Sequence, residues 1–88
     1  MNRKTKDFLA VIDENKGLIY KIVQAYCKNK DLHQDLTQEI ILQLWTAFDG
    51  YNSNFKISTW MYRIALNTAI SYYRKGFNER RHSSEFLP

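Results

Sequence analysis

The stretch from Ser58 to Lys75 constrains the fold of this chain more than any other segment. Drawn as a helix at about 100° per residue, it is apolar on nearly every side. One apolar strip comprises Tyr62, Leu66, Ala69 and Tyr73, and a second, on roughly the other side, comprises Ile57, Met61, Ile64, Ala65 and Thr68. Two strips predict a helix that is wedged between neighbours, with both tyrosines in the core.

The polar side chains of this helix form one narrow stripe of Thr59, Arg63, Asn67 and Arg74. Arginines can neutralise phosphates, and an asparagine can donate to and accept from a base edge. Lys75, Arg80 and Arg81 extend the basic character, which is also typical of a solubilising helix end. The stripe favours an anionic partner with hydrogen-bonding groups, and nucleic acid is the leading candidate.

Composition predicts one all-α domain. The 88 residues include three glycines and one proline, which is the last residue, and no alternating apolar run indicates a strand. We expect Gly17 to interrupt the first helix, Asp31 and Gln34 to form a capping box for the second, Ser58 to cap the third and Gly76 to end it. The expected organisation is a three- to four-helix domain over 1–80, with helices at about 6–28, 31–48 and 57–75 and a polar tail over 81–88.

The helix expected at 31–48 has two unlike faces. Its core face comprises Leu36, Ile40, Leu44, Ala47 and Phe48. Its outer face comprises Asp35, Gln38, Glu39, Leu42 and Thr46, with Trp45 at the margin. An exposed leucine with a polar rim and a nearby aromatic is typical of a protein contact patch, although a solvated face with one stray leucine is the alternative.

The charges are segregated along the chain, whose net charge is +4. No Lys or Arg occurs between Asp31 and Phe55, whereas the charged residues from Lys56 to Arg81 are mostly basic. This division indicates two different partners, and we expect the partner of the acidic outer face to have a basic surface.

Several function classes are excluded by what the sequence lacks. Cys27 is alone, His33 and His82 are isolated, and no nucleophile–base pair or phosphate loop occurs, so we expect neither an enzyme, nor a metal, nor a cofactor. Neither a signal peptide nor the roughly 20 apolar residues of a membrane span are present, so we expect a cytoplasmic protein without membrane insertion.

Two ordered motifs carry a family resemblance over about residues 10–80. DLTQEIILQLW at 35–45, followed by FKISTWMYRIALNTAI at 55–70, resembles the second conserved domain of bacterial RNA polymerase sigma factors. The extracytoplasmic-function (ECF) group is the most similar. The resemblance implies binding to the clamp helices of the polymerase's largest subunit and recognition and melting of the promoter −10 element, whose single-stranded non-template strand is captured with a base flipped out.

The resemblance also assigns residues. Polymerase contacts would be Asp35, Gln38, Glu39, Leu42 and Trp45. DNA contacts would be Phe55, Lys56, Ser58, Thr59, Arg63 and Asn67, with Arg74 and Lys75 on the backbone. An anti-sigma factor is a further implied partner. Complete members of the group are expected to carry a second, helix-turn-helix domain for the upstream promoter element, which we do not expect within these 88 residues.

Two alternatives remain from the residues themselves. A helix-turn-helix module for double-stranded DNA would need a polar recognition helix, which the stretch 58–75 is too apolar to provide. A helical protein–protein adaptor would not need an exposed, continuous stripe of Arg63, Asn67 and Arg74.

Overall fold

The computed structural model describes the backbone of residues 2–51 and 54–86 and the side chains as far as Arg74. Within these residues the structure is all-α and contains no strand, which confirms the predicted fold class. The four helices and two 3₁₀ turns are α1 (Arg3–Glu14), α2 (Lys16–Tyr26), η1 (Lys30–Leu32), α3 (His33–Ala47), η2 (Phe48–Gly50) and α4 (Ile57–Phe86).

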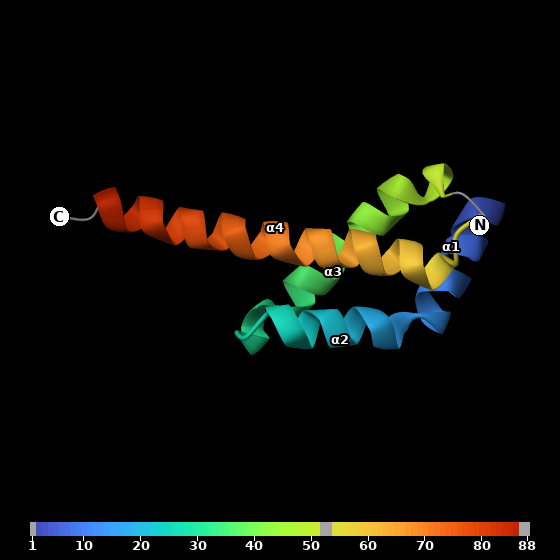
Figure 1. Ribbon diagram of the computed structural model, residues 1–88, viewed down its shortest axis with the longest axis horizontal. Helices are drawn as coiled ribbons and strands as arrows, with labels where there is room; N and C mark the ends of the chain where they lie inside the picture. The colour runs from blue at the N-terminus through green and yellow to red at the C-terminus, as the bar shows by residue number, and fades with distance from the viewer. Residues whose placement is uncertain (1, 52–53, 87–88) are drawn as a thin grey trace.

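Three helices pack against one another, and α1 closes one end. Helices α2 and α4 run side by side in the same direction, and α3 crosses behind α4 (Figure 1). Helix α1 lies at the end where α4 begins, and the C-terminal part of α4 extends beyond the other helices (Figure 1).

The core is a single apolar cluster to which every helix contributes. Its fully buried members on α3 are Leu36, Ile40 and Leu44, which confirms the predicted core face of that helix. Cys27 is buried as a small apolar side chain, again as expected. The cluster comprises Phe8, Ile19, Ile22, Val23, Cys27, Leu36, Ile40, Leu44, Met61, Ala65 and Ala69.

The first helical segment breaks at Asn15 rather than at Gly17. The Asn15 side chain donates from Nδ2 to the Val11 carbonyl at 2.9 Å, and its backbone N–H bonds the Val11 and Ile12 carbonyls. An asparagine that hydrogen-bonds the preceding turn competes with helix continuation. Gly17 lies inside α2, so the predicted break was two residues too late.

The junction before α3 is capped by Asn29 and not by Asp31. Asn29 Oδ1 accepts from the Asp31 backbone N–H at 3.0 Å and begins the 3₁₀ turn η1. Helix α3 then begins at His33, without a side-chain cap. The predicted capping box at Asp31 and Gln34 is therefore wrong, because an asparagine two residues earlier already satisfies this amide.

Helix α4 begins at Ile57, where the predicted range 57–75 begins, but it is not capped by Ser58 and it ends later than expected. Its first intrahelical bond runs from the Trp60 N–H to the Lys56 carbonyl at 3.1 Å, so Ser58 lies inside the first turn and does not cap it. The helix continues through Gly76 to Phe86. A glycine stop uses a positive φ, which no described glycine has, and a helical glycine costs only about 1 kcal/mol. The expected polar tail is thus helical as far as Phe86.

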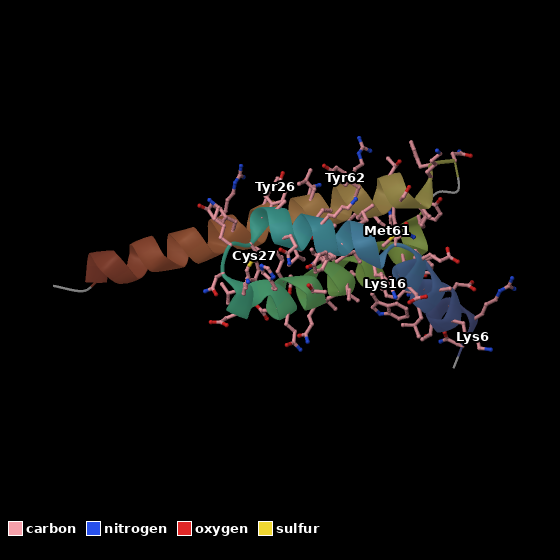
Figure 2. All side chains as sticks on the ribbon, turned by 90° about the horizontal axis from the view of Figure 1, so that it is seen from below. Lys6, Lys16, Tyr26, Cys27, Met61 and Tyr62 are labelled. Carbon is pink, nitrogen blue, oxygen red and sulfur yellow. The ribbon has the colours of Figure 1, made fainter. Side chains whose placement is uncertain are left out.

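A further error concerns which sides of α4 are buried. Among the α4 side chains that the structure describes, one strip is fully buried, made by Met61, Ala65 and Ala69. Tyr62 and Tyr73 are 48% and 64% exposed, so the prediction that they are core residues is wrong. In Figure 2, Met61 lies between α4 and its neighbours and Tyr62 lies on the outer edge. Helices α2 and α3 both cover the same side of α4, and the opposite side remains open.

Candidate functional site

The outer face of α3 gathers four of the five side chains predicted to bind a protein. Asp35, Gln38 and Leu42 are exposed, Leu42 by 54%, and Glu39 is partly exposed. Glu39 Oε1 accepts from Gln43 Nε2 at 3.2 Å, one turn later on the same helix. We call these four residues the acidic face: an apolar centre with two carboxylates, suited to a basic and partly apolar partner.

Trp45 stands apart from the acidic face. Its ring packs edge-on against Phe8 of α1, with 5.1 Å between centroids, and Lys4 Nζ lies 4.2 Å from the ring centroid. Lys4 Nζ also forms an ion pair with Asp49 Oδ2 at 3.0 Å. The sequence does not predict that Lys4 or Phe8 contacts Trp45, because nothing in the local pattern indicates that α1 folds back onto the end of α3.

The segment before α4 presents the predicted DNA-contacting residues at the surface. Phe55 is 56% exposed, Lys56 and Thr59 are exposed, and Ser58 is partly buried in the first helical turn. The Tyr51 hydroxyl donates to the Phe55 carbonyl, which anchors the segment. Tyr51 also packs against Trp60, with ring centroids 5.2 Å apart.

The predicted polar stripe is exposed along one side of α4. Thr59, Arg63, Asn67 and Arg74 are all exposed, and their spacing places them on one face of the helix. Among the residues whose side chains the structure describes, no carboxylate pairs with Arg63 or Arg74, so their charges face outward. The Lys75 side chain lies outside the described residues. We call Thr59, Arg63, Asn67 and Arg74 the basic stripe.

One hydrogen bond joins the helices that carry these two surfaces. Tyr72, on the inner side of α4, donates from Oη to Asp35 Oδ2 at 2.7 Å. This hydrogen bond, with desolvation and the nearby negative charges, raises the pKa of Tyr72 to about 12. Sequence reasoning did not single out Tyr72, since a tyrosine at helical spacing is ordinarily a packing residue.

Comparison with known proteins decides the family. The model for Sigma-70 region 2 matches residues 11–79. The chain belongs to this family. The match covers both motifs and extends from α1 into the part of α4 beyond the basic stripe.

Relatives of this sigma region 2 domain are ECF sigma factors, which confirms the recognition made from the two motifs. The ECF RNA polymerase sigma factor SigW of Bacillus subtilis strain 168 is 34% identical over 68 residues, covering 77% of this chain and 36% of the relative. The ECF RNA polymerase sigma-E factor of Escherichia coli strain K12 is 31% identical over 71 residues, covering 81% of this chain and 36% of the relative.

The chain therefore spans little more than a third of the length of these curated relatives. No solved structure matches it significantly. In the part of the region 2 domain that the structure describes, no helix combines the length and the apolarity that crossing a membrane requires, and no three His, Cys, Asp or Glu side chains gather as a metal site would need.

Proposed function

We propose that this region 2 domain uses its acidic face to bind the clamp helices of RNA polymerase's largest subunit and its basic stripe to bind promoter DNA. The observation that carries the proposal is the separation of two exposed surfaces of opposite charge on neighbouring helices. Asp35 and Glu39 lie on α3, and Arg63 and Arg74 lie on α4. Each surface suits a different macromolecule, and a transcription factor of this family has both as partners.

The chemistry of α4 favours the single-stranded non-template strand of the −10 element over a duplex. Tyr62 and Tyr73 are each followed by an arginine, and their exposed rings can stack on unpaired bases while Arg63 and Arg74 neutralise phosphates. Tyr62 and Tyr73 are eleven residues apart, three helical turns or about 16 Å, so both lie on one side. Capture of a flipped base by Phe55, Lys56 and Thr59 would offset an unpairing cost of a few kcal/mol.

The same two surfaces determine which other partners the domain could have. An anti-sigma factor would have to cover the acidic face or the basic stripe in order to inhibit the domain. Action on RNA polymerase would place the domain in the cytoplasm. The exposure of the basic stripe supports DNA binding over a simple protein adaptor.

The test uses core RNA polymerase and fluorescently labelled domain. Glu39→Lys reverses the charge of one of the two carboxylates of the acidic face without removing a core contact, so we expect loss of polymerase binding with an unchanged fold. Glu14→Lys at the exposed end of α1 is the matched control and should bind normally. Anisotropy measures polymerase affinity, and circular dichroism checks the fold. Equal affinity of the Glu39→Lys variant and the wild type would refute the proposed polymerase surface.

A parallel measurement addresses DNA. A random-sequence oligonucleotide pool is enriched on the domain bound to core polymerase, and the enriched sequence is compared as single strand and as duplex, with polymerase alone as the blank. We expect preference for the single strand, strengthened by polymerase and weakened by salt. Preference for the duplex, with no effect of polymerase, would favour a helix-turn-helix mode instead.

A further inference from the structure

The Asp35–Tyr72 hydrogen bond joins α3, which carries the acidic face, to α4, which carries the basic stripe. Asp35 is in the first turn of α3, on the acidic face, and Tyr72 is two residues before Arg74 of the basic stripe. Thirty-seven residues separate the two in sequence, yet Tyr72 Oη and Asp35 Oδ2 are 2.7 Å apart. A single carboxylate therefore belongs both to the surface assigned to the polymerase and to the packing of the DNA-facing helix.

The contact is directional, unlike the packing around it. The Tyr72 ring is partly buried against the apolar core, so the ring already has a place without its hydroxyl. The hydroxyl adds a hydrogen bond to an ionised acceptor, which is shorter and stronger than one between neutral groups. Apolar packing between α3 and α4 tolerates small shifts, whereas this bond fixes the position of α4 relative to one carboxylate.

We infer that Asp35 and Tyr72 form a positioning contact through which polymerase docking on α3 sets α4 for DNA binding. Asp35 Oδ2 accepts the hydrogen bond from Tyr72, and Oδ1 of the same exposed carboxylate can accept one from a donor on a basic partner. A partner that holds Asp35 in one orientation also holds the Tyr72 hydroxyl, and with it the segment of α4 that carries Arg74. The inference rests on the proposed function, because it needs both ligands to bind this domain.

Coupling of this kind is reciprocal. If polymerase raises the affinity of the domain for the single strand by some factor, the single strand must raise its affinity for polymerase by the same factor. The factor is therefore measured in both directions with labelled wild-type domain, core RNA polymerase and the enriched single-stranded oligonucleotide. The affinity of polymerase alone for the oligonucleotide is measured separately and included in the analysis of the cycle.

Tyr72→Phe is the diagnostic variant because it removes only the hydroxyl, and that hydroxyl is not part of either proposed surface. We expect an enhancement of about fivefold or more in the wild type, which is the lower end of typical coupling. In Tyr72→Phe we expect less than half of the wild-type enhancement, whereas the affinity for each ligand measured separately should be nearly unchanged. Tyr20→Phe, on α2 and 64% exposed, removes a tyrosine hydroxyl outside both proposed surfaces and should keep the full enhancement.

A spectroscopic readout establishes that the variants act through this contact. Tyrosinate absorbance on titration should contain a late-ionising component in the wild type and in Tyr20→Phe, and Tyr72→Phe should lose that component. Asp35→Asn should move it to lower pH. If the late-ionising component is undiminished in Tyr72→Phe, the contact assigned here does not form.

The outcomes separate this inference from the proposed function. A wild type that binds both ligands without mutual enhancement would overturn the coupling, whereas the assignment of the acidic face to polymerase and of the basic stripe to DNA would stand. Equal enhancement in the wild type and Tyr72→Phe would assign Tyr72 a packing role and likewise overturn it. A wild type that binds neither ligand would overturn both.

Discussion

Helices α3 and α4 are built on the same spacing and differ in what they place on it. Each buries a column at four-residue intervals: Leu36, Ile40 and Leu44 on α3, and Met61, Ala65 and Ala69 on α4. The α3 column is bulky and supplies most of the apolar volume, whereas two alanines let the α4 backbone lie close to its neighbours. Position in the pattern determines which side of a helix is buried, and side-chain size determines how near the neighbouring helix can lie.

The outer faces of the two helices differ as clearly. Helix α3 exposes carboxylates around a leucine, and α4 exposes arginines beside tyrosines. The two helices therefore differ in the chemistry of their exposed sides rather than in how they are held, because α4 packs against both α2 and α3.

Truncation of the bulky column should have the largest effect. Leu44 is fully buried, so Leu44→Ala should lower the free energy of unfolding by about 2–5 kcal/mol. Leu42→Ala, two residues earlier on the same helix but 54% exposed, should change it by about 0.5 kcal/mol or less. Urea unfolding followed by circular dichroism measures both. Similar losses in the two variants would mean that α3 does not have the inner and outer faces described here.

The same contrast explains which parts of the fold were predictable from the sequence. Most apolar side chains of α3 occur on one side, with Leu42 as the exception, so the pattern alone identifies Leu36, Ile40 and Leu44 as core. Helix α4 is apolar on two sides, and the pattern cannot tell whether both are covered. Tyr62 and Tyr73 were therefore misassigned, because the position of α2 and α3 on one side of α4 is a property of the assembled domain.

In the candidate site too, features set by local spacing were predictable and features set by packing between helices were not. Exposure of Arg63, Asn67 and Arg74 follows from their spacing and could be predicted. The hydrogen bond between Asp35 and Tyr72 could not, because it joins residues whose separation in sequence carries no local pattern. Helix ends were predicted least well, since a nearby asparagine side chain decides them at Asn15 and Asn29.

Asn67→Ala should have an intermediate effect, and it tests whether α4 reads bases or only binds charge. Loss of its amide should weaken binding to the enriched single strand by about 1–3 kcal/mol and binding to a scrambled strand by much less. Gln24→Ala removes an exposed amide from α2 and should leave both affinities unchanged. Anisotropy with the two oligonucleotides gives the comparison. Equal losses on both strands would restrict the role of Asn67 to structure or to sequence-independent contact.

The smallest effect is expected at high pH, where the contact between the two helices should fail. The pKa of Tyr72 is raised from 10.0 to about 12, chiefly by its hydrogen bond to Asp35, with desolvation and the charge of Glu39 acting in the same direction. The neutral form is therefore favoured by folding, so this contribution to stability is complete below about pH 10 and is lost as the pH rises through about 12. Urea unfolding across this interval should show a steeper decline for the wild type than for Tyr72→Phe. Tyr73→Phe should follow the wild type, since the hydrogen bond to Asp35 is made by Tyr72 and is intact in this variant. Parallel declines in the wild type and Tyr72→Phe would mean that the hydrogen bond between α3 and α4 adds nothing to the stability of the fold.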